Sequence, residues 1–422
     1  MAEKLAIHGG SKVREKGFPS VGNASGRMIG DEEKALVMEV LDSGALNRNN
    51  GTKVKDFEQR FASWYGVKDA VASSSGTSAL HIAVGSLDLE PGDEVITSTI
   101  TDMGSVIGIL AQNLVPIFAD VDVRTGCITA ETIEKVLSPR TRAIMPVHLF
   151  GQPSDMDPIM KLAKKHDLFV IEDASQSHGA VYKGRRVGTI GDVNAFSFQQ
   201  SKQMTTGDGG MTISDNEKLA TRARLFMDKA WPRTSGSRGH AFLGYNYRMT
   251  ELQGAVGIAQ LGKLDEILRL RRATGDRLTA AISDIPGVNP PYHYDGITHS
   301  YWIYSFTIDE KRFGVTGRQF AKALGAEGAP FGAGYIPNPM FGYPVIKDRV
   351  TFGTSQIPWS LPQARPGITY SNDDVPNTLW FLEHTINMSW NEGITDADVD
   401  DLAAAIRKVA TWLEANPGSL EA

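Results

Sequence analysis

The chain has 422 residues, of which 41% are hydrophobic and 22% are charged, a composition typical of folded globular proteins and far from that of disordered chains. This length exceeds the size at which a single hydrophobic core keeps growing, so we expect one large and one smaller domain. The net charge is −6, and no run of Lys and Arg is dense enough to bind a phosphate backbone, which argues against nucleic acid as a partner.

Targeting and redox signals are also lacking. Residues 1–17 carry charges but no apolar core segment, so they do not have the pattern of a secretory signal. No apolar stretch approaches the length needed to cross a bilayer, and we therefore expect no membrane partner. The single cysteine, Cys127, excludes an internal disulfide and a cysteine-cluster metal site, and we expect no metal. A cytoplasmic location is the resulting expectation.

The first predicted elements in chain order are helices at residues 31–44 and 53–66, where apolar residues recur at helical spacing. Short apolar strands then alternate with helical stretches. The strands are expected at residues 69–75, 92–99, 142–150 and 168–175, and the helices between them at residues 76–87, 102–113 and 156–166. This alternation predicts an α/β domain of three layers, in which helices cover both faces of a mostly parallel sheet.

A long predicted helix at residues 251–282 leads to the turn-rich segment 285–296, which we interpret as the hinge into a second domain. The remainder opens with a strand at residues 300–309, passes through the Pro- and Gly-rich segment 326–344 and closes with a helix at residues 396–416. This pattern predicts a smaller α+β domain. The expected limits are an N-terminal arm at residues 1–30, a large domain at 31–285 and a small domain at 286–422.

A carboxylate pair ends one predicted strand of the sheet. Residues 168–180 read LFVIEDASQSHGA, in which an apolar strand runs into Glu172 and Asp173. Ligands of such folds bind at the carboxyl ends of parallel strands. An Asp placed there can pair with a protonated pyridine nitrogen and keep the ring an electron sink. The alternatives are a helix cap or a metal ligand.

A lysine lies beside a turn rich in small residues. Residues 195–211 read AFSFQQSKQMTTGDGGM, in which an apolar strand leads to Ser197 and then to Lys202. A lysine beside such a turn can reach a bound aldehyde and form an imine, if its amine is partly neutral. The alternative interpretation is a solvated surface lysine, and composition alone favours it.

A candidate phosphate site lies at residues 70–85, where a short strand ends in Ser and Gly residues and a helix begins at about Thr77 or Ser78. Free amides at a helix N-terminus and small hydroxyl side chains together bind anions well. The alternative is a capped helix without a ligand. No G-x-G-x-x-G motif is present, so the segment is not a dinucleotide fingerprint. Along the chain the order is phosphate site, strand-end Asp, then Ser and Lys before a Gly-rich turn.

With this order the chain resembles the DegT/StrS family of pyridoxal-phosphate (PLP) sugar aminotransferases, which share the fold of the aspartate aminotransferase superfamily. The motifs that carry the resemblance are SSGTSALHIA, PGDEVI, PVHLFGQPSDMD, EDASQSHGA, VGTIGDVNAFSF, SKQMTTGDGGM and GYNYRMTELQGAVG. It covers nearly the whole chain. The resemblance implies PLP fold type I, with an αβα large domain and a smaller α+β C-terminal domain.

Carried over by position, the resemblance assigns three residues to the cofactor ring. It implies that Lys202 binds PLP as a Schiff base, that Asp173 pairs with the pyridine nitrogen, and that Gln176 donates to the phenolic oxygen. Family members that are dehydratases have histidine in place of this lysine, so Lys202 favours transamination. The freed lysine would then act as the general acid and base.

The resemblance also assigns the phosphate group. It implies that Gly76, Thr77 and Ser197 hold the phosphate, and that Asn246 reaches the phosphate of a second copy across a homodimer interface. Arg248 is close by in sequence. It is expected either to contact substrate or the interface, or to form a structural ion pair.

Two histidines and one departure from the family pattern remain. His178 and His148 are candidate pocket residues, with a hydrogen-bonded supporting role favoured for His178 over proton transfer. Family members usually have an aromatic residue that stacks on the ring where this chain has Asp102 and Met103. A methionine thioether can cover a ring face, so Met103 is the candidate, whereas Asp102 adds negative charge beside an anionic cofactor.

The predicted activity is transfer of an amino group from glutamate or glutamine to a keto cyclitol or keto sugar, in antibiotic or amino-sugar biosynthesis. The LAIHGG and WNEGIT segments look more like the aminocyclitol branch, whose acceptors are free keto-inositols. The alternatives are a nucleotide-keto-sugar aminotransferase, a PLP-dependent dehydratase or aromatising synthase, and a binding or regulatory protein without chemistry.

Overall fold

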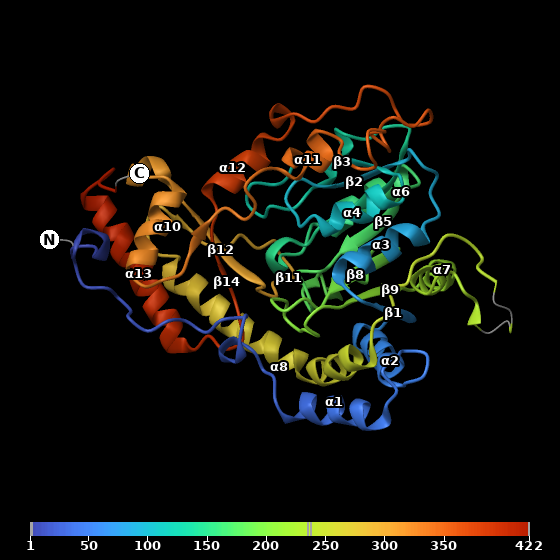
Figure 1. Cartoon of the computed structure of the whole chain (residues 1–422). Coiled ribbons are helices and arrows are strands. Elements are labelled where there is room, and N and C mark those ends of the chain that lie inside the picture. The colour runs from blue at the N-terminus through green and yellow to red at the C-terminus, as the bar shows by residue number, and fades with distance from the viewer. Residues whose placement is uncertain (1–2, 234–235, 237–238, 421–422) are drawn as a thin grey trace.

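The computed structural model describes residues 3–233, 236 and 239–420 (Figure 1). A large part is built on a seven-stranded sheet and a smaller part on a four-stranded antiparallel sheet. The two parts lie side by side, with helix α8 running along both (Figure 1). This arrangement confirms the predicted mostly parallel α/β sheet with a smaller α+β part.

The large sheet carries the strands on which the predicted site depends. Its order is β1 (Asp69–Ser73), β9 (Gly210–Ser214), β8 (Val193–Ser197), β5 (Phe169–Asp173), β4 (Thr141–Met145), β2 (Glu94–Ser98) and β3 (Val115–Ala119). All neighbours pair in parallel except β9, which runs antiparallel to β1 and β8. The turn after Ser197 therefore returns the chain along β9.

Side chains alternate between the two faces of this sheet, as the pleat of a strand requires. Val95, Ala143, Ile171 and Val193 pack against α3 (Gly76–Ser86) and α7 (Glu217–Met227). Their neighbours in sequence face the other side, where the helices α2 (Lys53–Tyr65), α6 (Met156–Lys165) and α8 (Glu251–Ile282) pack. Burial on both faces explains why these strands read as short continuous apolar runs.

The smaller part has its own hydrophobic core. Its strands are β10 (Val288–Asn289), β12 (Ile303–Ile308), β14 (Ile386–Ser389) and β13 (Gly332–Ala333), in that order. Helices α10 (Gly317–Ala326) and α13 (Asp396–Ala415) cover this sheet. The other described elements are η1 (Ala6–His8), η2 (Ala24–Gly26), α1 (Asp31–Ser43), α4 (Gly104–Ala111), α5 (Ala130–Glu134), η3 (Leu149–Gly151), β6 (Val181–Tyr182), β7 (Arg185–Arg186), β11 (Ile297–Thr298), α9 (Glu310–Phe313), η5 (Met340–Gly342), α11 (Pro344–Lys347), η6 (Asn372–Asp374) and α12 (Pro376–His384).

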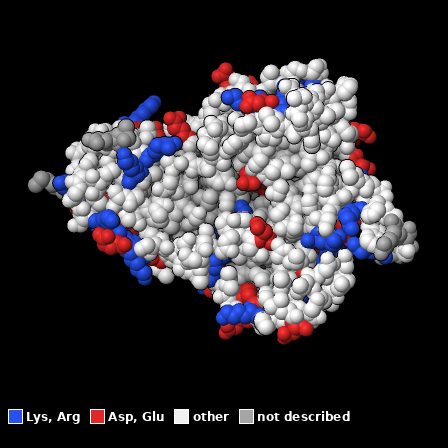
Figure 2. All heavy atoms as spheres, in the orientation of Figure 1, with Lys and Arg blue, Asp and Glu red and all other residues white. Residues whose placement is uncertain are grey.

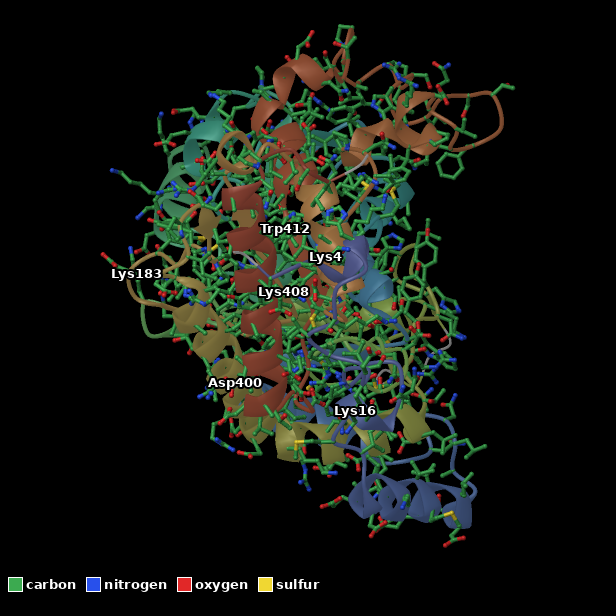
Figure 3. All side chains as sticks on the ribbon, turned by 90° about the vertical axis from the view of Figure 1, so that its left-hand side faces the viewer. Lys4, Lys16, Lys183, Asp400, Lys408 and Trp412 are labelled. Atoms are coloured by element: carbon green, nitrogen blue, oxygen red, sulfur yellow. The ribbon has the colours of Figure 1, made fainter. Side chains whose placement is uncertain are left out.

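Two segments pack away from their neighbours in sequence. The N-terminal segment lies against α13, where the labelled Lys4 is near Lys408 and Trp412 (Figure 3), and Leu5 is buried in the core of the smaller part. Conversely, Met340 and Trp359 are buried in the core of the large sheet. The domain limits at residues 30 and 285 therefore stay a prediction, since long-range packing joins these segments to other parts of the fold.

Figure 2 shows small groups of positive and negative side chains scattered over one face, with wide uncharged areas between them. Within the described residues, no helix is long and apolar enough to span a membrane.

Candidate active site

Asp173 ends strand β5 and is 3% exposed. Its Oδ2 accepts a hydrogen bond from Ser105 Oγ at 2.6 Å, and its Oδ1 accepts one from the Ser175 amide at 3.1 Å. Strand alternation turns Glu172 to the opposite face. Asp173 is thus a buried, oriented carboxylate at the carboxyl end of a parallel strand, where ligands of this fold class bind.

Glu172 has a structural role. It accepts hydrogen bonds from the amides of Gly188, Ile190 and Gly191 at 2.6–2.8 Å. Burial alone would raise the pKa of Glu172, but these amides and His148 together hold that pKa below its usual value. Glu172 therefore ties the segment after β7 to the sheet and does not line the cavity of Lys202.

Lys202 lies in the turn between β8 and β9 and is only 8% exposed. Its Nζ lies 3.4 Å from the centroid of the Trp302 ring, and its carbonyl accepts a hydrogen bond from Arg27 Nη1 at 2.7 Å. Burial lowers the pKa of Lys202 to about 8, although the Asp173 and Asp102 carboxylates act in the opposite direction. The alternative of a solvated surface lysine does not hold, because this amine is buried and partly neutral near physiological pH.

The start of α3 forms a concave site for an anion. The Ser75 side chain caps the helix by accepting from the Ser78 amide at 3.0 Å. The Gly76 and Thr77 amides, by contrast, have no acceptor within the described residues and are free to bind one. A Cβ on Gly76 would lie 2.5 Å from Ser197 Cβ, so only glycine lets Ser197 approach the helix end.

These groups line one cavity of about 360 Å³. The lining residues are Ser75, Gly76, Thr77, Leu80, Thr101, Asp102, Gly104, Ser105, Asp173, Ser175, Gln176, Ser197, Gln199, Ser201, Lys202, Asp208, Trp302 and Tyr335. The structure thus brings together the predicted Lys202, Asp173, Gln176, Ser197, Gly76 and Thr77.

Gln176 is held between the two parts of the fold. Its Oε1 accepts from the Phe150 amide at 2.8 Å, and its Nε2 donates to the Tyr335 hydroxyl at 3.4 Å. The amide group of Gln176 is thereby oriented with its NH₂ on the cavity side, as a hydrogen-bond donor requires.

Several lining residues were not singled out from the sequence, and Trp302, Tyr335 and Ser105 matter most among them. Trp302 and Tyr335 come from the smaller part of the fold, and Ser105 is the hydroxyl that holds Asp173. Trp302 lay in a predicted strand and Tyr335 in a segment with only turn signals, so no local pattern pointed to the cavity. A serine that contacts an aspartate 68 positions away in the sequence is visible only in the fold.

The two predicted histidines do not line the cavity. His178 is fully buried behind Ser197, and its Nε2 lies 2.8 Å from the Ser197 carbonyl. Burial lowers the pKa of His178 to about 4, so the ring is neutral and donates this bond. His148 instead lies 3.0 Å from Glu172 Oε2 and accepts from the Ser154 amide at 3.0 Å. Both histidines support the strands that carry the site.

Three further predicted residues also lie outside the cavity. Met103 packs against the large core, and the neighbouring Asp102 lines the cavity in its place. Asn246 is exposed on the segment before α8. Arg248 forms an ion pair with Asp228, which is the structural alternative that the sequence had left open.

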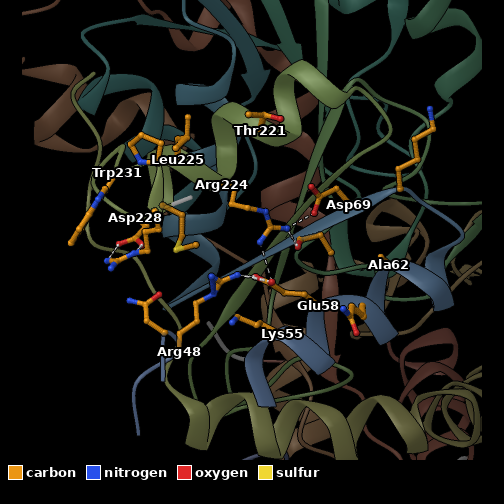
Figure 4. A pocket seen from close by; sticks show the side chains of 17 residues that line it. Arg48, Lys55, Glu58, Ala62, Asp69, Thr221, Arg224, Leu225, Asp228 and Trp231 are labelled. Atoms are coloured by element: carbon orange, nitrogen blue, oxygen red, sulfur yellow. Dashed lines mark hydrogen bonds and ion pairs between the residues drawn. The ribbon is translucent and has the colours of Figure 1, made fainter. Parts of the chain in front are cut away.

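A second cavity, of about 900 Å³, lies between α2, β1 and α7 (Figure 4). It is larger, but its central groups neutralise one another: Arg48 lies 2.6 Å from Glu58, and Arg224 pairs with Glu58 and Asp69. Its two lysines, Lys55 and Lys68, are exposed, so none of the described residues that line it is a buried amine. The cavity of Lys202 is therefore the candidate active site.

The residues of this cavity fit PLP. A buried, partly neutral amine suits an aldehyde, the Gly76 cradle with free amides suits a phosphate, and the buried Asp173 suits a protonated ring nitrogen. These three groups face one cavity, which is the arrangement that covalent binding of this cofactor needs.

Comparisons with known proteins agree with this chemistry. The family model described as the DegT/DnrJ/EryC1/StrS aminotransferase family matches residues 27–407. A provisionally named L-glutamine:3-amino-2,3-dideoxy-scyllo-inosose aminotransferase of Micromonospora echinospora is 34% identical over 437 aligned positions and covers 100% of both chains. GDP-perosamine synthase of Caulobacter vibrioides is 34% identical over 395 positions, which cover 93% of this chain and 99% of that protein.

Solved structures share the fold. The crystal structure of an aminotransferase from Psychrobacter cryohalolentis matches with a TM-score of 0.80 and 29% identity, over 92% of this chain and 98% of that one. The expected fold type I of PLP enzymes is thereby confirmed.

Proposed function

Because the chain belongs to the DegT/DnrJ/EryC1/StrS family of PLP-dependent aminotransferases, we propose that it moves an amino group from glutamate or glutamine to a keto cyclitol. The observation that carries the proposal is Lys202, a buried amine with its pKa lowered to about 8 in the cavity that Asp173 and the α3 N-terminus share. A general acid and base works best when its pKa lies near the operating pH.

Three of the lining residues, Lys202, Asp173 and Gln176, serve the cofactor ring in this reaction. Bound PLP supplies an aldehyde that accepts amino groups and a ring that stabilises negative charge. Lys202 holds the cofactor covalently and, once released, moves a proton at its Nζ. Asp173, oriented by Ser105 and Ser175, keeps a proton on the ring nitrogen. Gln176 donates a hydrogen bond to the ring's oxygen substituent.

The phosphate is held by groups of α3 and β8. The Gly76 and Thr77 amides and the Ser197 hydroxyl donate to it, and the helix N-terminus adds favourable charge. Trp302 and Tyr335 close the cavity from the side of the smaller part, where they exclude water from the reacting groups.

The choice of acceptor rests on the relatives. The Micromonospora relative, which aligns over 100% of this chain, is named for a keto cyclitol, and this supports the cyclitol acceptor. The second candidate is a nucleotide keto sugar, which the GDP-perosamine synthase of Caulobacter supports. A dehydratase or aromatising synthase remains the third candidate, and the presence of Lys202 argues against the dehydratase.

We further propose a homodimer in which Asn246 completes the phosphate site of the partner. Asn246 is exposed and does not line the cavity of its own chain. Leu243 is 76% exposed and Leu46, which lies beside Thr250 through the pairing of Asn47, is 49% exposed. Exposed apolar side chains on the segment between α1 and α2 and on the segment before α8, the second of which carries Asn246, suit an interface between copies.

The test has two arms. The PLP-loaded protein is mixed with glutamate or glutamine, and conversion of PLP to its amino form is followed by absorbance. The aminated protein is then mixed with a keto cyclitol or a nucleotide keto sugar. We expect conversion by one of the donors and its reversal by the cyclitol. No conversion by any amino donor would contradict the proposed transamination.

A further inference from the structure

Asp102 is an unpaired carboxylate on the wall of the active-site cavity. It lies in the turn between β2 and α4, where its Oδ1 accepts a hydrogen bond from the Gly104 amide at 2.8 Å. Its Oδ2 has no protein partner in the described part of the chain, and the residue is exposed and lines the cavity. The side chain is therefore fixed by one oxygen and presents the other to whatever enters.

No described Lys or Arg side chain forms an ion pair with Asp102, so its Oδ2 has no cationic partner. Of the described residues that line the cavity, Lys202 is the only cation, and the proposed function commits its amine to the cofactor. Asp173 is different, because Ser105 and Ser175 already donate to it. Beside a site for a phosphate, the Asp102 carboxylate is stabilised further when a bound molecule donates hydrogen bonds to its free oxygen.

Two aromatic residues of the smaller part, Trp302 and Tyr335, line the same cavity. Trp302 is held in place by hydrogen bonds from its Nε1 to Ser201, and Tyr335 packs edge-on to Trp302 with centroids 6.1 Å apart. Burial raises the pKa of Tyr335, so its hydroxyl stays protonated and can donate. Aromatic faces cover the C–H groups of a ring, while a carboxylate accepts from its hydroxyls.

We propose that Asp102 selects the acceptor: its free oxygen accepts hydrogen bonds from the hydroxyls of a neutral polyhydroxylated ketone and repels a ketone with a carboxylate at that end. This inference rests on the proposed function, because it names how the same cavity chooses its acceptor. Hydrogen bonds to charged groups and like-charge repulsion each change affinity by about ten- to a hundredfold.

The substitution Asp102→Asn tests the inference, because asparagine keeps an oxygen for the Gly104 amide but replaces the free, charged oxygen with an NH₂ group. The aminated enzyme is reacted in single turnovers with scyllo-inosose, a neutral keto cyclitol, and with 5-keto-D-gluconate, a keto polyol with a carboxylate. We expect the wild type to prefer the neutral ketone, and Asp102→Asn to lower that preference about tenfold or more. Asp295→Asn, an exposed carboxylate in the turn before β11, is the matched control and should leave the preference unchanged.

A binding measurement supplies a readout without turnover. Calorimetric titration of the PLP-loaded protein with scyllo-inositol, which has no keto group, should show about tenfold weaker binding in Asp102→Asn than in the wild type. Equal binding in both proteins, or no binding by the wild type, would overturn the role of Asp102. PLP affinity and the thermal midpoint check that the variant is folded, and Asp102→Ser, whose hydroxyl can still cap the Gly104 amide, replaces it if they change.

The two proposals fail in different ways. If no donor aminates the wild-type enzyme, the proposed function fails, and the inositol titration still decides on Asp102. If the wild type transfers amino groups and Asp102→Asn keeps the same preference between the two ketones, only the role of Asp102 is refuted.

Discussion

The substitution Gly76→Ala tests whether the α3 N-terminus holds the cofactor phosphate. A Cβ at this position would lie 2.5 Å from Ser197 Cβ and 2.7 Å from Ser197 Oγ, whereas ordinary contact begins at 3.4 Å. Either α3 or Ser197 must therefore move by about 0.9 Å, taken as the difference between the 2.5 Å and 3.4 Å separations. Neither can move cheaply, since Gly76 begins a buried helix and Ser197 ends a buried strand.

A displacement of this size lengthens hydrogen bonds to the phosphate beyond their useful range. Losing one bond to a charged group costs about 1.5–3 kcal/mol, which corresponds to about ten- to a hundredfold weaker PLP binding. Overpacking costs the fold about 1–3 kcal/mol as well. PLP affinity is measured by titrating apoprotein and following absorbance, and stability is measured by thermal denaturation.

The matched control is Gly262→Ala in the exposed middle of α8, where a Cβ meets nothing within 4 Å. Alanine there should leave PLP affinity unchanged and stabilise the helix by up to about 1 kcal/mol. If Gly76→Ala binds PLP as tightly as the wild type, the phosphate does not lie at the start of α3, and the assignment of Gly76, Thr77 and Ser197 is wrong.

Two pH-linked predictions follow from the buried charges. The pKa of Lys202 is about 8, below the usual 10.5 of a lysine, so covalent capture of PLP by apoprotein should accelerate up to about pH 8 and then level off. Continued acceleration toward pH 10.5, measured by rapid mixing, would mean that this amine is not desolvated. The unfolded chain binds more protons between these pKa values, so the contribution of Lys202 to apoprotein stability should rise with pH across that window. Glu172→Gln should destabilise the protein by about 1.5–3 kcal/mol in thermal denaturation, because the amides of Gly188, Ile190 and Gly191 lose a charged acceptor. Folding lowers the pKa of Glu172, so the stabilisation that this carboxylate gives the fold is present above its unfolded pKa and is lost as pH falls through its folded pKa. The Glu172→Gln variant should therefore lose less stability on acidification than the wild type. An equal loss of stability in both proteins would contradict this role.

The local sequence pattern predicted those site residues that lie at the end of a strand or at the start of a helix. Asp173, Ser197 and Gly76 each lie at the end of a strand or the start of a helix, and the carboxyl ends of parallel strands meet at one edge of a sheet. Lys202 was different, since its own surroundings favoured a surface lysine. The family resemblance placed Lys202 in the site, and the structure shows the burial that makes its amine reactive.

The remaining walls of the cavity depend on long-range packing. Trp302 and Tyr335 reach the cavity because the smaller part folds back onto the large sheet, through bonds such as Trp302 amide to Phe150 carbonyl at 2.9 Å. Asp102 and Met103 are adjacent in sequence, yet only the backbone at the start of α4 decides that Asp102 faces the cavity and Met103 the core. No periodicity in the sequence carries that information.

The central claim is that Lys202 binds the cofactor as a Schiff base. It is tested most directly by reducing this bond to a stable secondary amine. The PLP-loaded protein is reduced with borohydride, digested and analysed by mass spectrometry. We predict a pyridoxyl-phosphate group on the peptide that contains Lys202, and none on that peptide in Lys202→Ala. Modification of a lysine of the second cavity, such as Lys55 or Lys68, with Lys202 unmodified, would contradict the claim.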